Sequence, residues 1–180
     1  IVSHLTNGDI SIERVQNIIR ARSNKYWYKV YRPFYEAVNN AVQLFHKVDL
    51  TISQELSFRS LEDGAQRYAE DLYKVDLYYR KFIQSYRQSN QNSILKPLAQ
   101  KVEKVYSNDW LLQINGQWQN IIDQLEAWPV ENNLSQRQFF NQHVKQYTDK
   151  EQRLFVIISD ALRFEIGRDF FDQLAADHRF

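Results

Sequence analysis

A stripe of apolar residues that recur every three or four positions constrains this chain more than any other feature. It starts shortly after Ser60 and continues to Tyr86. This spacing places the side chains on one face of an α-helix of roughly 40 Å, at about 1.5 Å per residue. Ser60, with Asp63 three residues later, resembles a capping box, so we predict a long amphipathic helix that begins there. Its apolar face consists of Ala65, Tyr68, Ala69, Leu72, Val75, Tyr79, Phe82, Ile83 and Tyr86.

A second long helix is predicted over residues 108–128, and Pro129 ends it. Gly116 lies in its middle, where it permits a bend or a close contact between helices. We interpret the tryptophans of this helix as core residues rather than as a cofactor site; on an exposed helix they would form a docking face. The apolar face consists of Trp110, Ile114, Trp118, Ile121, Leu125 and Trp128.

Shorter helices complete the first part of the chain. They are predicted at about residues 11–22, 33–47 and 95–106, and a further one is capped by Ser135 with Gln138 three residues later. The 180 residues include only 4 Gly and 3 Pro, which argues against an all-β fold with its many tight turns. We therefore expect residues 1–150 to form a multi-helix region with two long helices.

The sequence pattern changes at Glu151. Five apolar residues, 154–158, follow without polar alternation, as in a strand buried on both faces of a parallel sheet. A helix is predicted from about Phe164 to Ala175. Residues 151–180 therefore read as one strand–helix unit of a truncated α/β domain. Because the chain starts at Ile1 and stops at Phe180, we expect an excised piece of a longer protein. The predicted fold class is mainly α, with this unit at the end.

Asp160 stands at the end of the predicted strand, where open α/β sheets bind their ligands. A carboxylate held there suits a hard divalent metal, and Arg163 could bind a phosphoryl oxygen. The alternative is that Asp160 ends the strand and caps the next helix. The segment "SDALRFEIG" lacks the dinucleotide-binding G-x-G-x-x-G pattern, and the chain lacks G-x-x-x-x-G-K-[ST]. Leu162 occupies the position at which haloacid-dehalogenase-type phosphatases place a second aspartate.

The stretch "FVIISDALRFEIGRDFFDQL" resembles the start of the PglZ domain of the BREX phage-resistance systems of bacteria, in particular type 1 BREX. The family is similar to the alkaline phosphatase superfamily, and "DALRFE" matches its D-A-L-R-[YF]-E block. The resemblance implies that Asp160 binds a divalent metal, Zn or Mg/Mn, in the full-length parent. Arg163 and Glu165 are in register as candidate substrate-binding or supporting residues. Upstream, "KYWYKVYRPFYEAV" and "YSNDWLLQINGQW" resemble the helical region that precedes this domain.

The resemblance places the nucleophile and the remaining metal ligands beyond Phe180. We therefore expect no catalytic residue, no bound cofactor and no activity in the isolated chain. Two functions follow: part of a PglZ-type metal-dependent phosphatase or phosphodiesterase-like protein, or a helical scaffold that docks other BREX proteins. Self-association through the unpaired strand is a further expectation. With no cysteine, no signal-peptide pattern and no membrane-length apolar run, we expect a cytoplasmic location and no membrane contact.

Nucleic-acid binding remains an alternative because Lys25–Arg32, "KYWYKVYR", interleaves cations with aromatic rings that could stack on bases. The preferred interpretation is that the rings turn inward while the cations stay in water, since the net charge is only +1. We also expect DNA as a possible binding partner of the full-length parent protein. The four histidines have no paired spacing, so no histidine metal site is expected; they are His4, His46, His143 and His178.

Overall fold

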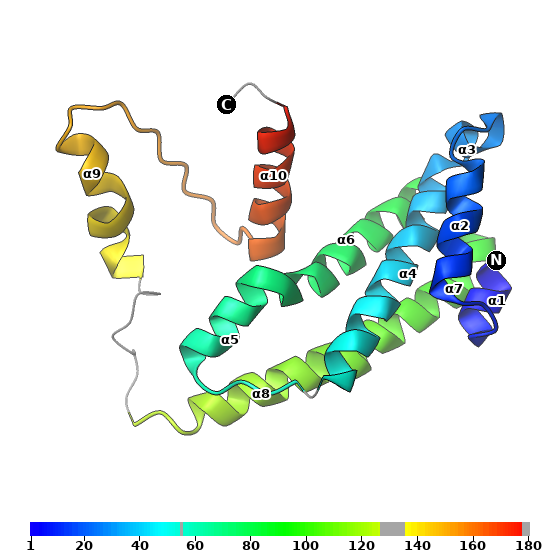
Figure 1. Ribbon diagram of the computed structural model, residues 1–180, viewed down its shortest axis with the longest axis horizontal. Helices are drawn as coiled ribbons and strands as arrows, with labels where there is room; N and C mark the ends of the chain where they lie inside the picture. Colours follow the sequence, from blue (N-terminus) through cyan, green and yellow to red (C-terminus); the bar gives the residue numbers. More distant parts are fainter. Residues whose placement is uncertain (55, 127–135, 178–180) are drawn as a thin grey trace.

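The computed structural model describes residues 1–54, 56–126 and 136–177. Within these ranges the chain is mainly helical and contains no β-strand (Figure 1), which confirms the predicted mainly α class. The first part of the fold comprises α1 (Val2–Asn7), α2 (Ile12–Arg22), α3 (Tyr26–Val30) and α4 (Arg32–Ser53). Ser11 caps α2, because its Oγ accepts a hydrogen bond from the Arg14 amide at 3.3 Å.

No helix in the described part of the chain is long and apolar enough to cross a membrane.

The first predicted long helix is confirmed. It consists of α5 (Leu61–Arg67), the π-helical segment η1 (Tyr68–Leu72) and α6 (Tyr73–Gln88), which follow one another without a break. Ser60 Oγ accepts a hydrogen bond from the Asp63 amide at 3.2 Å, and Asp63 Oδ2 accepts one from the Arg59 amide at 3.0 Å. These two bonds satisfy amides that a helix start would otherwise leave unpaired.

The second long helix is longer than predicted at its start. Helix α7 (Asn92–Lys104), the π-helical segment η2 (Val105–Leu111) and α8 (Leu112–Ile122) form one continuous rod, so the expected break between residues 106 and 108 is wrong. No glycine or proline lies between Pro97 and Gly116 to interrupt the helical hydrogen bonds. The rod ends at Ile122; Trp128 and Pro129, which were expected to end it, lie outside the described residues.

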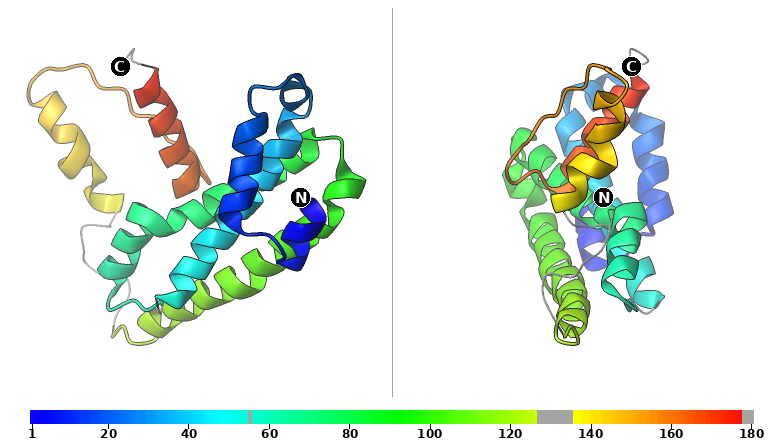
Figure 2. Two further views of the ribbon diagram at one scale, coloured as in Figure 1. Left: turned by 45° about the vertical axis from the view of Figure 1, so that its right-hand side comes forward. Right: turned by 90° about the vertical axis from the view of Figure 1, so that its left-hand side faces the viewer.

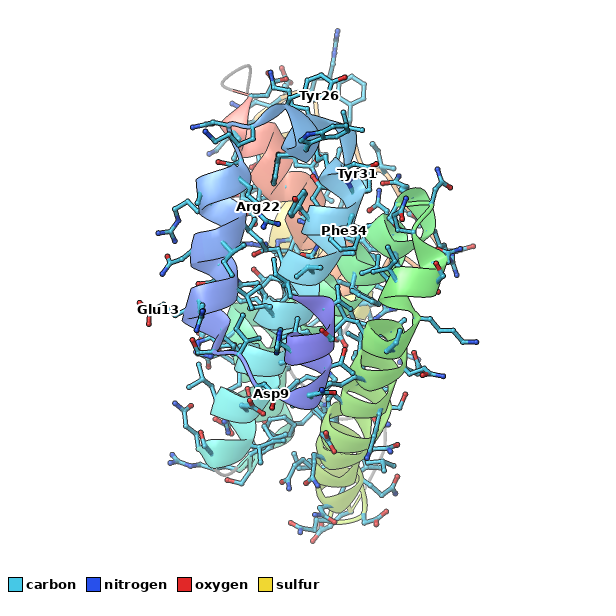
Figure 3. The ribbon with its side chains drawn as sticks, turned by 90° about the vertical axis from the view of Figure 1, so that its right-hand side faces the viewer. Asp9, Glu13, Arg22, Tyr26, Tyr31 and Phe34 are labelled. Carbon is cyan, nitrogen blue, oxygen red and sulfur yellow. The ribbon has the colours of Figure 1, made fainter. Side chains whose placement is uncertain are left out.

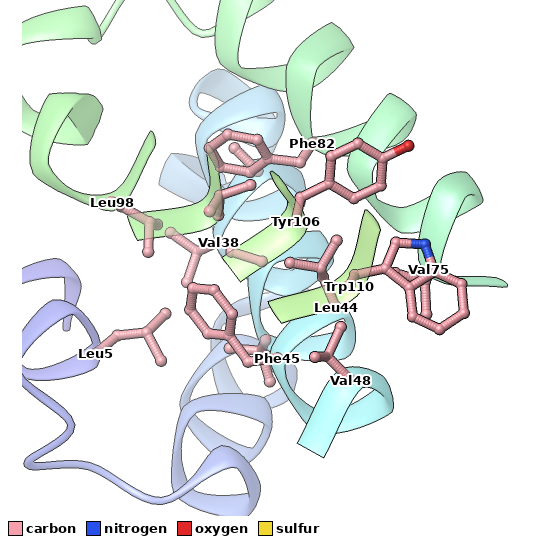
Figure 4. Close-up of a cluster of buried hydrophobic side chains, with 14 of the residues drawn as sticks. Leu5, Val38, Leu44, Phe45, Val48, Val75, Phe82, Leu98, Tyr106 and Trp110 are labelled. Carbon is pink, nitrogen blue, oxygen red and sulfur yellow. The ribbon is translucent and has the colours of Figure 1, made fainter. Parts of the chain in front are cut away.

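The core lies where α4 packs against both long rods (Figures 2 and 4). Leu44, Phe82 and Trp110 are the bulkiest fully buried apolar side chains. Trp110 is 1% exposed and Trp118 packs on the core, so these two tryptophans are core residues as predicted, whereas Trp128 lies outside the described residues. The buried cluster also includes Val15, Ala37, Val38, Ala41, Val42, Val48, Val75, Leu95, Leu98 and Val102.

Two glycines differ in their surroundings. A Cβ atom added to Gly64 would lie 2.8 Å from the Trp118 ring, so this glycine permits the close approach of α5 and α8. A Cβ atom added to Gly116 would meet nothing within 4 Å, so of the two roles expected for this glycine, a bend or a close helix contact, the close contact is not found. The long rods therefore touch through a glycine that the sequence did not single out.

The last part of the chain contains η3 (Gln136–Gln138), η4 (Phe140–Val144), α9 (Lys145–Thr148) and α10 (Phe164–Ala176). Helix α10 matches its predicted bounds to within one residue, but the predicted strand at residues 154–158 is wrong. These residues are extended without regular structure, and Phe155, Ile157 and Ile158 are 81%, 90% and 88% exposed. A strand needs neighbours for its backbone hydrogen bonds, whereas a helix forms them internally. The described ranges provide no such neighbour. Ser135, the predicted cap, lies outside them.

Candidate functional site

Asp160 lies in the turn between the extended segment and α10, and its side chain is exposed. The next residue, Ala161, has a φ of 59°, which turns the chain sharply towards the helix. Asp160 does not cap α10, because Arg163 occupies the N-cap position and no side chain bonds the first turn. Within the described ranges no group of three or more His, Asp or Glu side chains could hold a metal ion. One exposed carboxylate does not make a metal centre, since divalent metals take four or more ligands.

Arg163 and Glu165 lie at the junction between α10 and the helical body. The Glu165 side chain is fully buried, and Arg163 Nε lies 3.0 Å from Glu165 Oε1. Neither Glu165 oxygen has a hydrogen-bond partner, so the attraction to Arg163 is a contact between charges without an aligned N–H. Arg163 and Glu165 are therefore neighbours, and in the described ranges neither forms a hydrogen bond or ion pair with Asp160.

Arg163 reaches across to the second long rod, where it lies beside the Tyr106 hydroxyl. Burial disfavours the charged guanidinium, but the Tyr106 hydroxyl and the Glu165 and Asp76 carboxylates raise the pKa of Arg163 above its ordinary value. The arginine therefore stays charged although it is partly covered. Its position connects the start of α10 to a polar cluster inside the helical body.

Asp76 is the centre of that cluster. It is 6% exposed and accepts hydrogen bonds from Tyr106 Oη at 2.8 Å, from Trp110 Nε1 at 3.2 Å and from the hydroxyl of Tyr68. Burial and the neighbouring carboxylate raise the pKa of Tyr68 and of Tyr106 far above their ordinary values, so both hydroxyls remain donors. Sequence reasoning missed Asp76. The available signal was an acidic residue at a position of the apolar stripe, four residues after Leu72.

Helix α10 is also held against the first long rod by two ion pairs and two ring contacts. Asp169 accepts hydrogen bonds from Arg80 Nη2 at 2.8 Å and Lys81 Nζ at 2.7 Å, and its side chain is 16% exposed. Burial works against this carboxylate, but the two cations hold the pKa of Asp169 below its usual value. Phe164 adds edge-to-face ring contacts with Tyr68 and Tyr73, at centroid distances of 5.9 and 5.5 Å. The first helical turn of α10 and its inner face are therefore firmly docked.

Comparison with known proteins relates both parts of the chain to one family. Residues 139–180 match the family model described as the BREX system PglZ alkaline phosphatase-like domain. The alkaline phosphatase-like protein PglZ of Bacillus cereus is 31% identical over 164 residues, which cover 90% of this chain and 19% of that protein. The predicted resemblance to the PglZ family is confirmed. The alkaline phosphatase-like protein BrxZ of Escherichia coli is 28% identical over 192 residues, covering 100% of this chain and 22% of that protein.

The chain thus spans about one fifth of the length of these PglZ relatives. No solved structure matches it. Asp160, Arg163 and all of α10 lie inside the segment that matches the PglZ domain, whereas Asp76 and Tyr106 lie before it. The contact between Arg163 and Tyr106 therefore joins the PglZ-matching segment to the helices that precede it.

Proposed function

We propose that this chain is the positioning part of a PglZ-type hydrolase of a cytoplasmic BREX system. Residues 1–150 form a helical region, and residues 151–180 are the start of the alkaline phosphatase-like domain. The observation that carries the proposal is the placement of Arg163, three residues after Asp160, against Tyr106 and the buried Asp76. Through this contact the helical region fixes the turn that presents Asp160.

Asp160 then contributes one ligand to a divalent metal centre, and the other ligands come from elsewhere in a full-length PglZ protein. Its exposure and its lack of a hydrogen-bond or ion-pair partner in the described parts of the chain leave the carboxylate available. Arg163 and Glu165 act as positioning residues in this arrangement, because their charged groups face the helical body. In the described parts of the chain no group of three or more His, Asp or Glu side chains could hold a metal ion, and two-metal phosphoryl transfer needs two clamped ions, so we expect the chain alone to be inactive as a phosphatase or phosphodiesterase.

A chimera tests this proposal. The matching fifth of full-length Bacillus cereus PglZ is replaced by this chain, and hydrolysis of aryl phosphates and phosphodiesters is assayed with Zn²⁺, Mn²⁺ and Mg²⁺. Asp160→Ala should abolish the activity of the chimera, while Asp149→Ala, which removes an exposed acid of the same segment, should leave it unchanged. Hydrolysis by the 180-residue chain alone, lost on Asp160→Ala, would refute the expected inactivity. Equal activity of the two chimera variants would refute the metal-ligand role.

Docking of other BREX proteins is the second candidate function. Helix α10 exposes Phe170 and Phe171 at 60% and 59%. Neighbouring exposed rings of this kind mark a face that another protein surface covers. We propose that BREX components bind this face where the remainder of the alkaline phosphatase-like domain leaves it open. Each BREX protein would be co-expressed singly with the chain, and Phe170→Ser/Phe171→Ser should abolish co-purification. Retention of every partner by this variant would exclude the face.

A further inference from the structure

Three of the four aromatic residues between Lys25 and Arg32 face solvent, against the expectation that they turn inward. Tyr26, Trp27 and Tyr31 are 72%, 62% and 41% exposed. Helix α3 is a single short turn at the outer end of α2 and α4, so it has no core to pack into (Figure 3). Tyr28, by contrast, is half-buried and stacks on Tyr35 with the ring centroids 5.0 Å apart. The inward orientation is therefore correct for Tyr28 and wrong for the other three.

The exposed rings are already arranged relative to one another. Trp27 and Tyr31, four residues apart, stack at a centroid distance of 6.0 Å with 26° between their planes. Tyr26 meets Trp27 edge-on at 5.4 Å. Two flat rings held nearly parallel offer an outer apolar face to a planar ligand, and little side-chain freedom is lost when it binds.

The surroundings of these rings are strongly basic. Between Glu13 and Glu36 the chain carries six Lys and Arg residues and no Asp or Glu, although its net charge is only +1. Arg32 pairs with Glu36 at 2.6 Å. The other five form no ion pair with an acid anywhere in residues 1–54, 56–126 or 136–177; they are Arg14, Arg20, Arg22, Lys25 and Lys29. Because salt screens charges beyond about 8 Å under physiological conditions, the cations that act on a ligand at the rings are those nearest to them, Lys25 and Lys29.

We propose that this basic aromatic patch, defined as Lys25, Tyr26, Trp27, Lys29 and Tyr31, binds single-stranded DNA. Bases stack on the aromatic rings, while the two lysines pair with the backbone phosphates. The inference is independent of the metal-binding role proposed for Asp160.

Three features of the patch favour this ligand over other anions. Helix α3 has 5 residues, which is too short to follow the groove of a duplex or to lie along a membrane surface. The segment Lys25–Arg32 contains neither a carboxylate nor an amide side chain that would read the 2′-hydroxyl of RNA. Exposed π-faces flanked by cations match bases joined by phosphates.

The test measures the fluorescence anisotropy of a labelled dT12 oligonucleotide titrated with the 180-residue chain, at several salt concentrations between 50 and 200 mM. Trp27→Ala should weaken binding by about 5- to 150-fold, the range for loss of one stacked base. Lys25→Ala/Lys29→Ala should weaken binding and reduce the slope of log K against log salt by about 1.4. Phe170→Ala and Lys145→Ala/Lys150→Ala change equally exposed side chains elsewhere and should alter binding less than twofold.

Several results would overturn the proposal. They are no binding of dT12 by the unmodified chain at 50 mM salt, unchanged affinity in the Trp27→Ala variant, or an equal loss in the control variants. Binding of an rU12 oligonucleotide more than tenfold tighter than dT12 would assign the patch to RNA instead. Binding to anionic phospholipid vesicles without binding to dT12 would assign it to a membrane surface.

Discussion

Replacing Arg163 with alanine should release α10 from the helical body while the body stays folded. The substitution removes the positive charge 3.0 Å from Glu165, whose carboxylate is fully buried. Breaking a buried ion pair costs about 3–5 kcal/mol, but 52% of the Arg163 side chain is exposed, so we take a loss of about 2–3 kcal/mol. The least costly relief is for α10 to leave α6, because Glu165 then reaches water. Amide hydrogen exchange of α10 should accelerate by about 30- to 160-fold.

The measurement is hydrogen exchange resolved by peptide, with α10 and the core helix α4 compared in the same sample. A second substitution provides the decisive control: Glu165→Leu in the Arg163→Ala background removes the stranded charge and should restore most of the protection of α10. Arg168→Ala changes a half-exposed arginine of α10 whose partner Asp172 is also exposed, and should have little effect. Unchanged protection in Arg163→Ala, or equal loss in α4 and α10, would show that the pair does not hold α10 in place.

Three further predictions follow from the contacts described above. Gly64→Ala should lower the free energy of unfolding by about 1–2 kcal/mol, because the added methyl group would lie 2.8 Å from the Trp118 ring. Gly116→Ala should raise the free energy of unfolding by about 0.5–1 kcal/mol, because alanine favours the helix and its methyl group meets nothing. Urea melts of the two variants with the same sign would contradict this pair. The pKa of Asp169 is lower in the folded chain than its unfolded value near 4. The resulting stability is present above about pH 4 and is lost as the pH falls through the folded pKa. Asp169→Asn should therefore remove the acid dependence of hydrogen exchange in α10. Burial and the Glu103 carboxylate raise the pKa of Tyr79 to about 12. Its contribution to stability should therefore be full below pH 10 and lost as the pH rises towards 12. In a spectrophotometric titration, Tyr79→Phe should remove one tyrosine that ionises near pH 12.

The helices were predictable because their information is local. The stripe from Ala65 to Tyr86 and the Ser60 cap specify the first long rod by spacing alone, and both are confirmed. The division of the second rod was predicted incorrectly because a gap in an apolar pattern looks like a break even where no helix-breaking residue stands. Local spacing could not show whether residues 154–158 form a strand, since an apolar run indicates burial but does not supply a hydrogen-bonding neighbour.

The candidate site was less predictable because its contacts are distant in sequence. The resemblance made Arg163 and Glu165 candidate substrate-binding or supporting residues, but it did not indicate that Arg163 lies beside Tyr106 and Asp76. No spacing rule connects positions so far apart, and only packing brings them together. The exposure of Trp27 was missed for a related reason, since a basic and aromatic segment has the same sequence whether its rings face the core or solvent.

The three donors gathered around Asp76 also imply an order of assembly. Tyr68 belongs to the first long rod, and Tyr106 and Trp110 belong to the second, so the Asp76 cluster exists once the two rods have met. Arg163 then completes it from α10, which the ribosome makes later. We expect the helical body to fold first and to serve as the template on which α10 condenses. In refolding followed by pulsed hydrogen exchange, α6 and η2 should gain protection before α10, and simultaneous protection would argue against a template. A chain made from its N-terminus would then carry α10, which lies inside the PglZ-matching segment, onto a helical body that is already folded.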